Sequence, residues 1–357
     1  MTGPARSIMI FAALVVIAAG IKAAEDVVVP FLLAIFIATI ASTPMIALEN
    51  RRCPGWLAIA LVMAGIVMIL SAVGALVAQS AGAFMEKLPF YSERLTDMFD
   101  QAIRIVDRYG FDISSASQYF NPATALSMAG NTLSGLGSVL SNSFLILLTV
   151  IFILAEATSF PVKLREVLKD PDTDLPHFGK FAENVNRYIA LKTTISVFTG
   201  LTITIYLAIL GVDFPVLWGI LAFLLNYVPN IGSIIAAVPA VLLALVQLGS
   251  GYALLTAGGY VAVNVIMGNV VEPRFMGRGL GLSSLVVFLS LVFWGWMLGP
   301  VGMLLSVPLT MTAKIALEVN PNTQWLAYLL GPAAKPEEAT TPSTEQPGSD
   351  PGANIDA

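Results

Sequence analysis

The stretch "NYVPNIGSIIAAVPA", residues 226–240, interrupts one of the most apolar parts of this chain. It holds two prolines, each of which removes a backbone hydrogen-bond donor from a helix, and a glycine, which loosens one. Hydrocarbon cannot satisfy the polar backbone groups that such residues leave unpaired. Inside a membrane, this composition predicts a broken helix whose polar groups face protein, water or a solute.

The chain as a whole has the composition of a membrane protein. Of its 357 residues, 57% are hydrophobic and only 11% are charged, and the mean hydropathy is +0.82. Soluble domains carry about 25% charged residues, so lipid is the expected solvent. The net charge of −5 argues against nucleic-acid binding. One cysteine and one histidine exclude a Cys/His metal cluster or nucleophile, so we expect no cofactor, no metal and no enzymatic activity.

Apolar segments near 20 residues long predict membrane helices. The candidate segments are 7–24 (read as an uncleaved first span), 27–48, 55–78, 143–159, 189–210, 214–228, 231–249, 252–271, 283–298 and 301–317. Two of them, 214–228 and 283–298, are short, and each is followed across a Pro/Gly break by another apolar segment. These two pairs are either full spans or re-entrant hairpins. The predicted fold class is all-α: a polytopic helical membrane protein with a helical extramembrane insert.

Four regions are expected along the chain. They are N-terminal membrane helices (1–79), an extracytoplasmic helical insert (80–142), a C-terminal membrane transport core with a cytoplasmic elbow at 160–190 (143–318), and a cytoplasmic disordered tail (319–357). The insert begins with an amphipathic segment whose apolar residues recur at helical spacing. Lysine and arginine concentrate on one side of the predicted spans, and this bias places both termini in the cytoplasm.

The two interrupted pairs, 214–245 and 284–315, share a layout of apolar run, break, and apolar run with a second proline. Broken segments in corresponding positions point to a transporter's binding site. We therefore expect both breaks to line a substrate pathway, although two kinked helices joined by tight turns remain the plain alternative. The expected pathway residues are Asn226, Pro229, Asn230, Gly232, Ser233 and Pro239 in the first pair, Asn264 and Asn269 between the pairs, and Gly299, Pro300, Gly302 and Pro308 in the second.

Ionisable residues in or beside membrane segments are candidates for gating or ion coupling. Glu272 and Arg274 flank a proline and are expected to pair and to gate the inner end of the pathway, while Asp213 lies in the outer turn "GVDFP". For Asp213 and Lys192 the favoured interpretation is an ordinary position at the membrane interface.

The sequence resembles the autoinducer-2 exporter family of bacterial membrane proteins over residues 8–318. The resemblance is sharpest in "YVPNIGSIIAAVPAVLLAL", in "NVVEPRFMGRGLGLSSLVVFLSLVFWGWMLGPVGMLLSVPLT" and in the long insert after the third span. The chain departs from many relatives at "LSS", residues 282–284, where they carry a proline. The resemblance implies a multi-pass inner-membrane transporter with about eight membrane helical segments, assembled as a homo-oligomer.

The resemblance also implies export of a small solute, with autoinducer-2 as the leading example and quorum sensing as its setting. A neutral, hydroxyl-rich signal suits breaks that carry asparagine and serine. Because some relatives are described as cation exchangers, sodium- or lithium-proton antiport, with coupling to H⁺ or Na⁺, is the first alternative. The second alternative is a membrane scaffold or receptor whose outer insert binds a partner.

Overall fold

The computed structural model describes residues 3–109, 124, 143–157, 159–160, 163, 165, 171–229, 231–276, 281–319 and 323–332, and it contains only helices and turns within those ranges. The helices are α1 (Gly3–Ala23), α2 (Glu25–Glu49), α3 (Gly55–Arg108), α6 (Ser143–Ala157), α8 (Pro171–Leu210), α9 (Pro215–Leu225), α10 (Gly232–Leu248), α11 (Ser250–Val265), the π-helix η1 (Ile266–Val271), α12 (Glu272–Met276), α13 (Ser284–Val319) and α14 (Gln324–Leu330). Within the described ranges, five helices are long and apolar enough to cross a membrane. The all-α polytopic fold is confirmed.

The N-terminal helices pack through small residues. Ala34, Ala38 and Ala41 recur every three or four positions along α2, and all three are buried against α3 and α6. Small side chains let helix backbones approach closely where lipid supplies no hydrophobic drive for association. This cluster joins α2, the first part of α3 and α6 into one unit.

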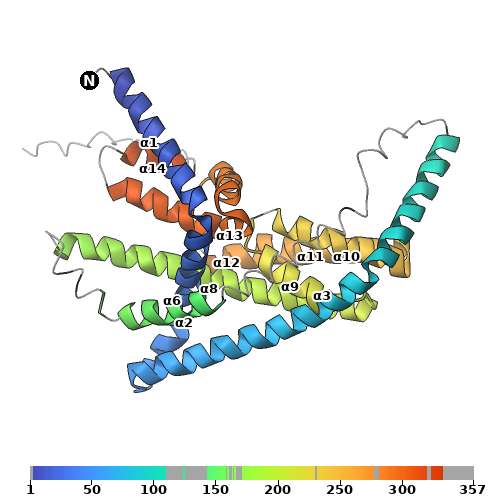
Figure 1. Cartoon of the computed structure of the whole chain (residues 1–357), viewed down its shortest axis with the longest axis horizontal. Coiled ribbons are helices and arrows are strands. Elements are labelled where there is room, and N and C mark those ends of the chain that lie inside the picture. The colour runs from blue at the N-terminus through green and yellow to red at the C-terminus, as the bar shows by residue number, and fades with distance from the viewer. Residues whose placement is uncertain are drawn as a thin grey trace, which may run out of the picture.

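Helix α3 is one continuous helix of 54 residues, about 80 Å long at 1.5 Å per residue. The sequence predicted a span over 55–78, followed by an amphipathic segment at the start of the insert. The joining stretch, "AQSAGAFMEKL", is rich in strong helix formers, and the helix continues through Pro89, which follows it. The end of α3 projects well beyond the other helices (Figure 1). The rest of the insert, apart from residue 124, lies outside the described residues.

The first interrupted pair forms a hairpin of α9 and α10. With 11 residues, α9 is about 16 Å long, too short to cross a bilayer core of about 30 Å. The chain turns between α9 and α10, and a side chain on Gly232 would collide with the carbonyl of Leu225. Glycine is therefore needed where α10 begins. The hairpin rests on α8 through Gly200 and Gly219, where a Cβ on Gly200 would lie 2.7 Å from the Gly219 carbonyl oxygen.

The second interrupted pair also folds back on itself. Within α13 the helix breaks at Leu298 and at Gly299, whose φ of 63° and ψ of −150° suit glycine. Trp294 Nε1 donates a hydrogen bond of 3.0 Å to Thr310 Oγ1, sixteen residues away. A straight helix would separate these residues by about 24 Å, so the two halves must lie antiparallel. Both pairs are therefore helical hairpins.

Two features were not predicted from the sequence. The short helix α14 follows α13 and packs against it, and the π-helix η1 lies between α11 and α12. Helix α8 begins at Pro171, inside the predicted elbow, and continues through the candidate segment 189–210. The stretch 319–357 was predicted to be a disordered tail, but α14 lies within it, at Gln324–Leu330. The residues beyond 332 lie outside the described ones.

Candidate functional site

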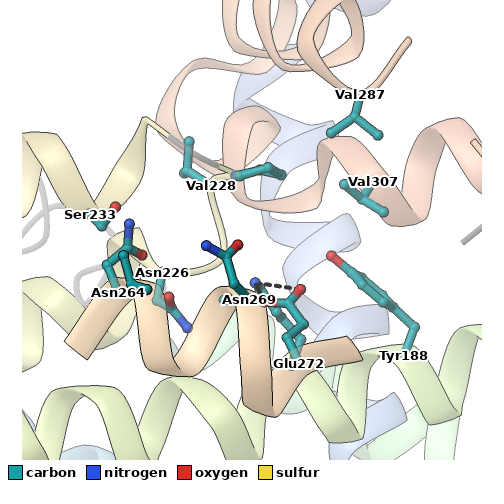
Figure 2. A pocket seen from close by; sticks show the side chains of 13 residues that line it. Tyr188, Asn226, Val228, Ser233, Asn264, Asn269, Glu272, Val287 and Val307 are labelled. Carbon is teal, nitrogen blue, oxygen red and sulfur yellow. Dashed lines mark hydrogen bonds and ion pairs between the residues drawn. The ribbon is translucent and has the colours of Figure 1, made fainter. Parts of the chain in front are cut away.

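A cavity of about 320 Å³ lies where the tip of the first hairpin meets α8, the α11–η1–α12 segment and α13. Figure 2 shows polar side chains gathered on one side of it and two valines of α13 on another. The lining residues are Tyr188, Lys192, Asn226, Val228, Pro229, Ser233, Asn264, Val265, Gly268, Asn269, Glu272, Val287 and Val307. Six of the sequence-predicted site residues therefore meet here: Asn226, Pro229, Ser233, Asn264, Asn269 and Glu272.

Two side-chain hydrogen bonds hold the hairpin tip on α8. Asn226 Nδ2 donates to Ser196 Oγ at 2.9 Å, and the Tyr227 hydroxyl donates to Thr193 Oγ1 at 2.7 Å. Ser196 is completely buried. Hydrogen bonds of this kind are strengthened by the low dielectric of a protein interior. They place the Pro229 turn at the edge of the cavity.

An ion pair lies in the wall of the cavity. Lys192 Nζ donates to both carboxylate oxygens of Glu272, at 3.0 and 2.9 Å, and the side chains are only 7% and 24% exposed. Figure 2 shows this contact beside Asn269. A buried charge is tolerated when it is paired, so the wall carries charged groups without a net charge.

This pairing corrects two interpretations of the sequence. Glu272 pairs with Lys192 of α8 rather than with Arg274, which is exposed on α12. Lys192 is 5% exposed and lines the cavity instead of lying in an open interface. The sequence feature that indicated this position is that Lys192 lies inside the apolar stretch "YIALKTTISVF". A charged residue within a membrane segment normally faces a partner of opposite charge or a water-filled space.

The π-helix η1 aligns the polar residues of the α11–η1–α12 wall. In an α-helix, residues five positions apart point about 140° away from each other. A π-helix bonds residue i to i+5, which brings such residues towards the same face. Asn264, Asn269 and Glu272 accordingly lie along one side of the cavity (Figure 2). Single turns of π-helix occur frequently at functional sites.

The amides of Asn264 and Asn269 are exposed and make no hydrogen bond to any other residue that the structure describes. Each amide offers two donors and an acceptor. Together with Ser233 they give the cavity hydrogen-bonding groups of both kinds. Such a surface suits a small hydroxylated molecule. Among the described residues, no group of three or more His, Cys, Asp or Glu side chains is placed to hold a metal ion.

The other predicted residues of the two hairpins lie outside the cavity lining. Gly232 and Pro239 are buried within the first hairpin, and Pro308 is buried in α13. Gly299, Pro300 and Gly302 form the tip of the second hairpin. This tip meets the junction of α1 and α2, where Lys22 Nζ donates to the Trp296 carbonyl at 2.5 Å. Asn230 lies outside the described residues.

Asp213 lies at the far end of α8, about 30 Å from Lys192 along the helix axis. Its carboxylate accepts hydrogen bonds from the Tyr91 hydroxyl at 2.8 Å and from Lys87 Nζ at 3.2 Å, both on α3. The Trp218 indole donates to its carbonyl oxygen at 2.9 Å. These contacts anchor the base of the first hairpin to α3.

Comparisons with known proteins agree with this architecture. Residues 11–322 match the family model described as "AI-2E family transporter". The chain is 42% identical to the "AI-2 transport protein TqsA" of Escherichia coli, over 91% of this chain and 95% of the relative. It is 41% identical to a Haemophilus influenzae protein that has only a general transport-protein name, over 91% of this chain and 96% of the relative. The resemblance seen in the sequence is confirmed, and the chain belongs to the AI-2E transporter family, a family of multi-pass membrane transporters.

Proposed function

We propose that this transporter exports autoinducer-2, or a small polar metabolite of similar chemistry, through the cavity at the tip of the first hairpin. The proposal draws support from the E. coli relative, whose name states AI-2 transport. Under the same proposal both termini lie in the cytoplasm. The solute then enters from the side of the cavity where Glu272 lies and leaves towards the Asp213 end.

One observation carries the proposal: the cavity wall is rich in hydrogen-bonding groups yet has no net charge. Its amide and hydroxyl groups come from Asn226, Ser233, Asn264 and Asn269, and its two charged groups neutralise each other. A volume of about 320 Å³ lies at the lower end of the range for small-molecule sites. A small, neutral, hydroxyl-rich solute fits this combination.

The test is efflux of labelled autoinducer-2 from proteoliposomes. We expect Asn269→Ala to raise the half-saturating concentration about fivefold to tenfold, because a lost hydrogen bond to solute costs about 1 kcal/mol or more. The matched control is Asn50→Ala, which removes an exposed amide at the C-terminus of α2, outside the cavity. Efflux that is unchanged in Asn269→Ala and in Pro229→Ala would show that the solute binds elsewhere.

Sodium- or lithium-proton antiport is the second candidate. It is favoured by the Glu272 carboxylate, a partly buried acid that faces the cavity. The corresponding measurement is the internal pH of vesicles after sodium is added. Antiport predicts a pH change that Glu272→Gln abolishes, whereas autoinducer-2 export without sodium coupling predicts none. The Lys192 ammonium already occupies the position of a cation beside Glu272, which is why antiport ranks second.

We further propose that the protein is a homo-oligomer. An apolar residue near the projecting end of α3 supports this, since Ile105 is more than half exposed. Lipid does not cover a helix that extends beyond the bilayer, so a neighbouring subunit is the expected cover. The mass of the detergent-solubilised complex measures the subunit number, and a monomeric mass would contradict the proposal.

A further inference from the structure

Two buried hydroxyl groups on α11, Thr256 Oγ1 and Tyr260 OH, have no hydrogen-bond partner among the described residues. Thr256 is completely buried and Tyr260 is 5% exposed. Other threonines in the same bundle avoid this state by bonding back to their own helix, as Thr199 does to the Ile195 carbonyl at 2.9 Å. A buried hydroxyl without a partner is costly, so these two groups call for an explanation.

Both hydroxyl-bearing residues lie on the face of α11 that leads into the cavity. Thr256, Tyr260 and Asn264 are spaced by four residues, which places them on one side of the helix. Asn264 lines the cavity, and the π-helix continues the same line to Asn269. The two hydroxyls are buried beyond the cavity lining and continue the line of polar groups about 12 Å along α11, away from the Lys192–Glu272 pair.

The extension leads towards the Asp213 end of the bundle. Helix α11 packs against α8, and the Tyr206 hydroxyl donates to the Leu255 carbonyl at 2.6 Å, which fixes the register of the two helices. Tyr260 shares a core cluster with Ala236 and Ala240 of α10, both completely buried. Alanine methyl groups offer no hydrogen bond, so the hydroxyl keeps its donor and acceptor for another molecule.

We infer that Thr256 and Tyr260 form a second hydrogen-bonding station on the solute pathway, between the cavity and the Asp213 end. The inference rests on the proposed function, since it requires a solute that bears hydroxyl groups. When a solute leaves the amides of the cavity, it loses their hydrogen bonds. Unless other groups replace these bonds, the free energy of the solute rises. The two hydroxyls supply these bonds inside an otherwise apolar helix interface. They determine which solutes pass, while the cavity determines which solutes bind.

The test uses the near-isosteric variants Tyr260→Phe and Thr256→Val in the full chain, with efflux of labelled autoinducer-2 from proteoliposomes. We expect the maximal rate to fall about fivefold in each variant, because one hydrogen bond to the passing solute is lost. The half-saturating concentration should stay unchanged, since the cavity is intact. The thermal midpoint should stay unchanged or rise, because removing an unpaired buried hydroxyl does not destabilise the fold.

Tyr206→Phe is the matched control, because it makes the same chemical change in the α8–α11 interface to a hydroxyl that has a backbone partner. We expect its maximal rate to equal that of the unmodified protein. Unchanged rates in Tyr260→Phe and Thr256→Val would overturn the inference. A parallel fall in rate and thermal midpoint would overturn it too, because it would reveal a structural hydrogen bond. Absence of efflux from the unmodified protein would instead refute the proposed function itself.

Discussion

At the scale of single residues, the ion pair between Lys192 and Glu272 is the most consequential contact in the candidate site. It joins α8 to the start of α12 across 80 positions of sequence, and it lies in the wall of the cavity. Removing one partner leaves the other charge poorly solvated, whereas removing both leaves a neutral site. Comparing a variant that lacks one partner with a variant that lacks both therefore distinguishes the structural role of the pair from its role in transport.

We predict that Glu272→Gln destabilises the protein by about 3 kcal/mol or more, because the Lys192 ammonium is left buried without its counter-charge. The double variant Lys192→Met/Glu272→Gln should recover most of this loss. Thermal unfolding in detergent measures both effects. If the pair gates the pathway, efflux should stay impaired in the double variant after stability returns. Full recovery of efflux together with stability would show that the pair is purely structural.

At the scale of elements, two breaks with similar layouts have different roles. The first hairpin brings its tip to the cavity, held by Asn226 and Tyr227 on α8. The second brings its tip to the α1–α2 junction, and α13 contributes Val287 and Val307 to the cavity wall. Pro/Gly content predicted both breaks correctly. It carried no information on which break would meet the polar face of α11, because that depends on how the hairpins pack.

We predict that Gly232→Ala destabilises the protein by about 1–3 kcal/mol, since the added methyl group meets the Leu225 carbonyl and the backbone must shift. Gly258→Ala is the matched control. It lies inside α11 with no neighbouring atom within 4 Å of the added carbon, so alanine should be neutral or slightly stabilising there. Thermal midpoints of the two variants test the difference. Equal midpoints would mean that the turn between α9 and α10 is looser than the structure shows.

At the scale of the whole molecule, the proposed orientation in the membrane is inferred from the distribution of lysine and arginine. The two ends of the long helix α3 are suitable positions for testing that orientation. The turn between α2 and α3 carries Arg51 and Arg52, and the other end of α3 reaches Arg108. A helix of about 80 Å exceeds the bilayer core by about 50 Å, and the proposed topology places its two ends on opposite sides of the membrane.

We predict that a cysteine at the position of Tyr109, which is 79% exposed, reacts with a membrane-impermeant maleimide in intact cells. A cysteine replacing Asn50, in the α2–α3 turn, should react only after permeabilisation, because the proposed orientation places this positively charged turn in the cytoplasm. Both variants are made in a Cys53→Ser background, since Cys53 is the only native cysteine. The reverse pattern would invert the proposed orientation and with it the direction from the cavity to the Asp213 end.

The sequence by itself determined the solvent, the helical class and the positions of the breaks. The hydropathy of a segment, and the effect of a proline or glycine on a helix, depend only on nearby residues. The solvent, the helical class and the positions of the breaks can therefore be predicted without knowledge of distant contacts. Of the twelve expected pathway residues, all named by such local reasoning, five line the cavity, together with the expected gating residue Glu272.

Only the tertiary structure decided that the broken pairs fold back as hairpins, that Glu272 faces Lys192, and that η1 aligns the asparagines with it. The physical reason is that each of these depends on packing between segments far apart in the chain. Glu272 pairs with Lys192 because packing brings α8 against α12, although Arg274 is much closer in the sequence.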